Sequence, residues 1–296
     1  MHLRSFRDVL AHRLIAQALE TPRADAAAHM LATQDQIYAA GVTALQIRSG
    51  SDVLREISEH RIVRAWTQRG TVHLVAAQDV GWLTRLCSPR VEAAAAKRRP
   101  GLGLTPQDCD RAHTAFRAVG ISPENGPGQH LLRSFGGRGD IAQGPREGSD
   151  DTFLLVEHLP TPQRELDGDD ALRELAVRYL ASHGPATVQD LSWWSGLTVR
   201  DAKRAVELAG DHTEKVTIEG RTETLYAPPE AEQISDEQLD AALQTQLELP
   251  AFDEYLIGYK DRSEFLPAEL VQVVGPTKNG MCRPFRVRQG IIAAAE

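Results

Sequence analysis

Residues 30–48, MLATQDQIYAAGVTALQIR, place two glutamines two positions apart between two runs that are typical of helices. Side chains at positions i and i+2 point about 200° apart in a continuous helix, whereas they share a face in an extended segment. Two cooperating carboxamides at Gln34 and Gln36 therefore require a break between a helix over residues 25–31 and a helix over residues 38–48. The stretch predicts a helix–turn–helix. An ordinary exposed role for both glutamines stays open, because glutamine is common on protein surfaces.

A two-stranded hairpin is predicted directly downstream. Residues 61–75, RIVRAWTQRGTVHLV, start as a strand-like run, turn at Arg69 and Gly70, and return through a second strand-like run. Before the hairpin, residues 6–19 have the apolar spacing of an amphipathic helix, and residues 51–60 have the pattern of a short one. Residues 1–78 are therefore expected to form one winged-helix unit.

Similar patterns recur twice further along the chain. The predicted helices span residues 79–97, 107–119, 128–135, 169–183, 187–194 and 198–208, and the predicted hairpins lie at 140–157 and 216–226. We therefore expect an α+β fold that is mainly helical, with three tandem winged-helix units followed by a small β-rich C-terminal region. The expected boundaries are 1–78, 79–160, 161–228 and 229–296.

The C-terminal region follows an acidic stretch at residues 230–248. Residues 252–262, 271–274 and 283–287 are predicted to form strands and turns. A polar cluster within the first of these runs either lines a cleft or is an ion-paired connector, and the sequence leaves both open. Its members are Asp253, Glu254, Tyr255, Lys260 and Arg262. Trp193 and Trp194 are expected to be core residues, because large aromatic side chains in a helix–turn–helix usually pack inward.

Several motifs carry a resemblance to a known family. They are Gln34-x-Gln36 with Ala44, Leu45 and Arg48, VRAWTQRGTVH at 63–73, SHGPAT at 182–187, WWSGL at 193–197, and FDEYLIGYKDR at 252–262. In this order they resemble the winged-helix DNA glycosylases of the AlkZ and YcaQ type over nearly the whole chain. Members of that family usually continue with further strands and a helix, so two expectations stay open for the C-terminal region of this chain: it is incomplete, or its end is unusual.

The resemblance implies that Gln34 and Gln36 are catalytic. Hydrolysis of an N-glycosidic bond passes through an oxocarbenium-like sugar, which is stabilised by electron-rich dipoles and attacked by a positioned water. Carboxamides are weak bases, but a purine alkylated at N7 or N3 is already cationic and leaves readily. Asp35 stands where the family usually has a small or apolar residue, and it should point away from the pair. A register with Ala32 and Gln34 in the motif stays open; we prefer the one that keeps Arg48 in place.

The charge of the chain is unevenly distributed. The formal net charge is −8, yet residues 1–147 carry 19 Lys and Arg against 14 Asp and Glu, whereas residues 148–296 carry 14 against 27. Because Lys and Arg supply most of the affinity for phosphates, the first half is expected to hold the DNA-binding face, although a scattered, solvated set of basic residues stays open. The candidate DNA contacts are Arg64, Arg69, His73, Arg90, Lys97, Arg98 and Arg99. For two of them a structural role is the alternative: Arg69 would hold the hairpin by hydrogen bonds, and His73 would be a satisfied strand histidine.

Neither a metal nor a cofactor is expected. The cysteines Cys87, Cys109 and Cys282 lack zinc-ligand spacing, and the glycines at 101 and 103 do not follow a strand, as a phosphate-binding loop would require. The apolar runs are far short of the roughly 20 residues of a membrane span, and the N-terminus lacks the pattern of a secretory signal. We expect a cytoplasmic, nucleoid-associated monomer that binds double-stranded DNA carrying alkylated bases, bulky or cross-linked ones included.

The alternative is a winged-helix DNA-binding protein without catalysis, such as a transcriptional regulator. Regulators commonly combine one winged helix with a dimerisation or ligand-binding domain, whereas three tandem units resemble a monomer that wraps one duplex. The lesion is not specified by the sequence, because the shape of the pocket selects it.

Overall fold

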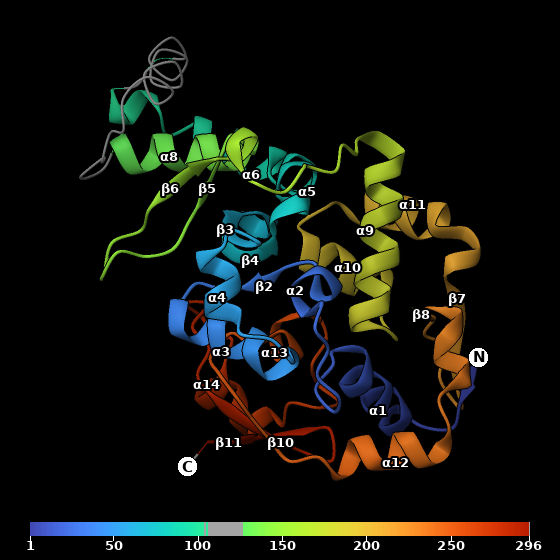
Figure 1. Cartoon of the computed structure of the whole chain (residues 1–296). Coiled ribbons are helices and arrows are strands. Elements are labelled where there is room, and N and C mark those ends of the chain that lie inside the picture. The colour runs from blue at the N-terminus through green and yellow to red at the C-terminus, as the bar shows by residue number, and fades with distance from the viewer. Residues whose placement is uncertain (104, 106–126, 296) are drawn as a thin grey trace.

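The computed structural model describes residues 1–103, 105 and 127–295, and the helix predicted over residues 107–119 lies outside them. A five-stranded sheet with the order β2-β4-β3-β5-β6 occupies the first half of the chain (Figure 1). Its strands are β2 (Thr33–Gln34), β3 (Ile62–Trp66), β4 (Val72–Ala76), β5 (Ile141–Gln143) and β6 (Phe153–Leu155). The first two predicted hairpins are confirmed, because β3 pairs with β4 and β5 pairs with β6, both antiparallel.

The hairpins do not belong to separate units, however. Arg64 of β3 pairs with Gln143 of β5, so the first two hairpins share one sheet. The third hairpin, β7 (Glu214–Ile218) and β8 (Leu225–Ala227), takes β1 (His2–Leu3) as a parallel neighbour. Three tandem winged-helix units are therefore not confirmed, although the fold does combine helices with β-sheets and about half of the described residues are helical. The boundaries at residues 78, 160 and 228 stay predictions.

The helices from α1 to α11 follow the predicted order with shifted ends, whereas α12, α13 and α14 were not predicted as helices. They are α1 (Phe6–Ala16), α2 (Ala26–Met30), α3 (Tyr38–Arg48), α4 (Val53–Ser58), α5 (Val80–Cys87), α6 (Pro89–Ala96), α8 (Pro127–Arg138), α9 (Gly168–His183), α10 (Val188–Ser195), α11 (Val199–Ala209), α12 (Asp236–Gln244), α13 (Glu254–Ile257) and α14 (Val271–Val274). The single helix predicted over residues 79–97 is two helices, because Pro89 lacks a backbone N–H and begins the second one.

Threonines mark the starts of α10 and α11. The Thr187 hydroxyl accepts a hydrogen bond from the Asp190 N–H (3.0 Å), while the Asp190 carboxylate accepts one from the Thr187 N–H (3.0 Å). Thr198 caps α11 by accepting the Asp201 N–H (3.1 Å) through its hydroxyl. Such caps satisfy backbone donors that have no partner within the helix, and they explain why both predicted helix starts are confirmed.

The C-terminal region differs most from the prediction. Its sheet contains β9 (Leu247–Leu249), β10 (Phe285–Arg288) and β11 (Ile291–Ala294), which confirms a strand near residues 283–287. The strands predicted at 252–262 and 271–274 are wrong, because these runs contain the short helices α13 and α14. Asp253 starts α13 by accepting the Tyr255 N–H (2.9 Å), a capping contact that a strand would not make.

One apolar cluster joins distant parts of the chain. It contains side chains of α1, α9 and α10 together with strands β10 and β11, and Trp82, Tyr179 and Trp194 are among its fully buried members. Figure 1 shows α9 standing beside α11 on one side of the molecule and α13 next to α3 on the other. The contact between α13 and α3 brings the C-terminal region to the glutamine motif.

A buried ion pair secures that contact. The Arg48 guanidinium at the end of α3 donates to both oxygens of Asp253, with Nη2–Oδ1 at 2.7 Å and Nη1–Oδ2 at 2.8 Å. Both side chains are inaccessible to solvent. Arg48 also donates to Gln17 Oε1 (2.8 Å) in the segment that follows α1. Three segments that are remote in sequence are thereby tied to one guanidinium.

We predict that Arg48→Met lowers the free energy of unfolding by about 3–5 kcal/mol, because the substitution leaves the Asp253 carboxylate buried without its counter-charge. Urea denaturation at neutral pH measures the change. The control is Arg55→Met, which removes an exposed pair with Glu59 and should change stability by less than about 1 kcal/mol. Equal destabilisation of the two variants would contradict a structural role for the buried pair.

Candidate functional site

The glutamine pair lies where the chain runs extended between α2 and α3. Gln34 pairs with His73 of β4, and the Asp35 N–H donates to the Val72 carbonyl (2.8 Å). The Gln34 Nε2 donates to Gln36 Oε1 (3.3 Å). The two carboxamides therefore share a face, as predicted, while Asp35 points to the opposite side. Gln34 is buried and Gln36 is exposed, so only the second is open to solvent.

Two backbone features produce this geometry. Leu31 ends α2 with a φ of 64°, a left-handed conformation that turns the chain out of the helix. Gly41 allows α3 to approach the extended segment, because a Cβ there would lie 2.2 Å from the Asp35 Oδ1 atom and 2.9 Å from its Cα. Any other residue at position 41 would push the motif away from the helix.

Arg64 and Asp35 form a buried ion pair beneath the motif. The Arg64 Nε donates to Asp35 Oδ2, and its Nη1 donates to Asp151 Oδ1 (2.6 Å). Burial raises the pKa of the Asp35 carboxyl to about 6, against the opposing effect of the Arg64 charge. Arg64 is itself buried and neutralises the aspartate of the motif, and its expected contact with DNA stays a prediction.

Arg69 touches the glutamine pair directly. Its Nη2 donates to Gln34 Oε1 (3.0 Å), and its Nη1 donates to the carbonyls of Trp194 (2.6 Å) and Trp193 (3.2 Å) at the end of α10. Burial lowers the pKa of Arg69, while the charge of Glu254 acts in the other direction. Of the two roles that the sequence left open, hydrogen bonding that holds the hairpin turn is the one observed.

His73 is a buried strand histidine. Its Nδ1 lies 3.0 Å from both the Thr67 hydroxyl and the Thr71 carbonyl. Burial, aided by the charge of Arg69, lowers its pKa to about 3, so the imidazole is neutral near pH 7. The expected DNA contact of His73 stays a prediction; in the folded chain the ring is buried among partners of the hairpin.

Glu254 contacts the motif from the C-terminal region. Its Oε1 accepts the Gln34 N–H (2.9 Å), its Oε2 accepts the Trp194 Nε1–H (2.9 Å), and His183 Nε2 lies 3.5 Å from Oε2. Burial alone would raise its pKa, but the interactions with His183 and the Gln34 N–H outweigh burial and lower the pKa to about 2. The sequence indicated only a polar cluster here, and Glu254 and Asp253 act as its connector.

The basic patch at the end of α6 divides into exposed and paired residues. Lys97 and Arg98 are exposed. The exposed Arg90 donates to the Gly196 carbonyl (3.1 Å), and Arg99 donates to Glu92 (3.1 Å) and Ser134 (2.9 Å). The side chains of Lys97 and Arg98 are therefore the best placed of the seven candidates to meet a phosphate.

The two tryptophans differ in exposure. Trp194 is buried as predicted, whereas Trp193 is 41% exposed. The Trp193 ring lies between two guanidinium groups, with Arg69 at 5.9 Å and Arg262 at 5.2 Å from its centroid. The prediction that both are core residues is therefore wrong for Trp193, because its position on α10 faces the hairpin turn rather than the cluster of apolar side chains.

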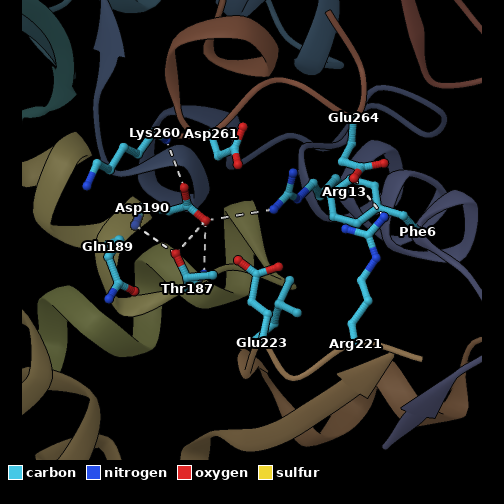
Figure 2. A pocket seen from close by; sticks show the side chains of 11 residues that line it. Phe6, Arg13, Thr187, Gln189, Asp190, Arg221, Glu223, Lys260, Asp261 and Glu264 are labelled. Carbon is cyan, nitrogen blue, oxygen red and sulfur yellow. Dashed lines mark hydrogen bonds and ion pairs between the residues drawn. The ribbon is translucent and has the colours of Figure 1, made fainter. Parts of the chain in front are cut away.

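A shallow hollow of about 390 Å³ opens beside Gln36. Gly70, Thr71, Arg133 and Gln143 are among the residues that line it. A second cavity of about 420 Å³ lies between α1, the start of α10 and the third hairpin, where Arg13 points toward Asp190 (Figure 2). Both acidic and basic side chains line this cavity, and its lining differs from that of the hollow beside Gln36.

Within the described ranges, no helix combines the length and apolar character needed to cross a membrane. The same ranges contain no cluster of three or more His, Cys, Asp or Glu side chains that could bind a metal ion. Cys87 and Cys282 are both free thiols.

Comparison with known proteins gives the class. Residues 27–294 match the family model described as DNA glycosylase AlkZ-like, and the chain belongs to that family. A similar protein is the interstrand DNA cross-link repair glycosylase of Streptomyces sahachiroi, with 23% identity over 97% of this chain and 86% of the relative. The solved structure of the DNA glycosylase AlkZ from Streptomyces sahachiroi has the same fold, with a TM-score of 0.77 and 23% identity over 98% of this chain and 87% of that one.

The buried histidine predicts sensitivity to acid. The pKa of His73 is about 3 in the folded chain and about 6.5 once the chain unfolds. Between these values the unfolded chain binds more protons, so the free energy of unfolding should decrease as the pH falls. His73 alone should contribute a decrease of about 2 kcal/mol between about pH 6.5 and pH 5. Urea denaturation across this range measures it.

The control for this prediction is His158→Gln, which changes a largely exposed histidine and should leave the pH dependence intact. His73→Gln should reduce the slope of the unfolding free energy against pH by an amount that corresponds to at most one proton. An unchanged slope in His73→Gln would mean that His73 is not the group that couples acid to unfolding.

Proposed function

We propose that this chain is a monofunctional DNA glycosylase that hydrolyses the N-glycosidic bond of alkylated purines. The observation that carries the proposal is the carboxamide pair of Gln34 and Gln36, held on one face with Gln36 exposed. Membership of the AlkZ-like family supports it. The substrate class is a purine alkylated at N7 or N3 in double-stranded DNA, and the enzyme would act as a monomer close to the nucleoid.

The proposed reaction needs no strong base. The bond between the anomeric carbon and the ring nitrogen breaks with its electron pair, which neutralises the cationic purine as it leaves. Water then forms a bond to the anomeric carbon and releases a proton to solvent. The carboxamide oxygens present partial negative charge toward the developing oxocarbenium ion and orient the water. Arg69 and Gln36 fix the Gln34 carboxamide from both of its ends.

An open site favours large lesions. Gln36 borders a shallow hollow rather than a closed chamber, and a bulky adduct cannot be turned through the duplex into a tight pocket. The Streptomyces sahachiroi relative is described as a cross-link repair glycosylase. We therefore extend the proposed substrates to bulky N7 adducts and interstrand cross-links.

We predict that Gln34→Ala combined with Gln36→Ala abolishes base release from duplexes containing N7-alkylguanine, N3-alkyladenine or an interstrand cross-link. Removal of both dipoles should lower the single-turnover rate constant by at least about 100-fold. The control is Gln244→Ala, at the end of α12 and outside the site. Full activity in the double variant would remove these residues from the mechanism, and no release of any alkylated base by the unaltered chain would favour a binding protein without catalysis.

We predict that charge reversal by Lys97→Glu and Arg98→Glu weakens DNA binding. If each side chain neutralises one phosphate, the slope of log affinity against log salt should decrease in magnitude by about 0.9 for each phosphate that the variant no longer neutralises. Fluorescence anisotropy at several salt concentrations measures both quantities. Lys215→Glu, an exposed reversal in the acidic half, is the control and should have the smaller effect. Unchanged binding in the Lys97 and Arg98 variants would place the patch outside the footprint.

A further inference from the structure

Two oppositely charged side chains are bridged by the same two residues. Glu254 accepts the Gln34 backbone N–H and the Trp194 Nε1–H, each at 2.9 Å. Arg69 donates to the Gln34 side-chain oxygen (3.0 Å) and to the Trp194 carbonyl (2.6 Å). Gln34 and Trp194 thus each give one N–H to the carboxylate and one oxygen to the guanidinium. This closed arrangement surrounds the inner glutamine of the motif.

We propose that Glu254 is a positioning residue, which holds the Gln34 strand by its main chain and supplies the counter-charge that allows Arg69 to fix the Gln34 carboxamide. The inference rests on the proposed glycosylase function, because it concerns how the glutamine pair is prepared for that reaction. Glu254 does not itself reach the substrate, since it is fully buried behind the motif.

The need for a counter-charge follows from the chemistry. Arg69 places a positive charge beside the Gln34 oxygen, close to where the reaction develops a cationic sugar. The positive charge of an uncompensated guanidinium there would destabilise the cationic transition state. The destabilisation would be large because Arg69 and Gln34 are both shielded from water. Glu254 is ionised at neutral pH and lies on the other side of Gln34. Arg69 therefore donates a hydrogen bond to the Gln34 carboxamide while Glu254 cancels its charge.

The position of Glu254 is set by its neighbour in sequence. Asp253 caps α13 and is held by the buried Arg48, so Glu254 begins the helix at a fixed place. The Nε2 atom of His183, which is also fully buried, lies 3.5 Å from the Oε2 atom of Glu254. The Glu254 carboxylate therefore has little freedom to move away from Gln34, as a positioning residue requires.

Glu254→Gln tests the proposal. The variant keeps the shape of the side chain but removes the charge and turns one acceptor into a donor that faces an N–H. Excision of N7-alkylguanine in single turnovers should slow by about 10- to 100-fold, while binding of undamaged DNA stays unchanged. Glu269→Gln, an exposed substitution of the same kind, should have neither effect. A rate constant equal to that of the unaltered chain would overturn the proposal.

A second substitution separates the counter-charge from a purely structural role. If Glu254 compensates Arg69, Glu254→Gln should slow excision less in an Arg69→Gln background than in the unaltered chain, because the charge that it compensates is then absent. An equal slowing in both backgrounds would overturn the counter-charge. Circular dichroism verifies that each variant is folded.

Two measurements keep the test decisive. If Glu254→Gln does not fold, Glu254→Asp replaces it, because it keeps the charge but shortens the reach; unaltered excision and unaltered hydrogen exchange at the Gln34 amide would then overturn the proposal. Faster amide exchange in Glu254→Asp supports it without any activity assay. If the unaltered chain excises no lesion, the glycosylase function fails while the exchange result still decides the positioning role.

Discussion

The contact between Arg48 and Asp253 is the constraint on which the site depends. Moving two full charges out of water costs more than an ordinary hydrogen bond returns, so such a pair persists only with close, two-pronged geometry. Here the partners lie 205 positions apart in the chain. Their pairing fixes the start of α13 against the end of α3, and it thereby sets Glu254 behind Gln34. The glutamine motif is thus completed by a segment from the opposite end of the sequence.

What could be predicted from sequence was local. The shared face of Gln34 and Gln36 follows from the two-residue period of extended chain, and the starts of α10 and α11 follow from capping threonines. The burial of Arg64 and His73 could not be predicted in this way. It depends on the pairing of β5 with β3, in which Arg64 and Gln143 lie 79 positions apart in the chain, and on a carboxylate that arrives from α13. The helix α13 was not predicted for a related reason. It has only four residues, and a run this short does not show whether its apolar positions repeat as in a helix or as in a strand.

Side chains of adjacent residues in the extended segment point to opposite sides and have different roles. Asp35 packs against Gly41 and is neutralised by Arg64, whereas the glutamines on either side turn toward each other and share a hydrogen bond. A charged residue is tolerated at the middle of the motif because its partner comes from β3. The ion pair between Asp35 and Arg64 also ties the motif to the sheet. The position of the two glutamines therefore depends on the contacts of the aspartate between them. A hydrophobic residue at position 35 would leave Arg64 without that partner.

The pairing of β1 with β7 has a consequence for how the chain is made. Residues 2 and 3 pair with residues 217 and 218, so β1 is synthesised long before the strand that covers its edge. Contacts between such distant positions raise the contact order and slow folding. An uncovered edge invites pairing with other chains during this interval. The short length of β1 limits that hazard, because two residues offer little template for a neighbouring nascent chain.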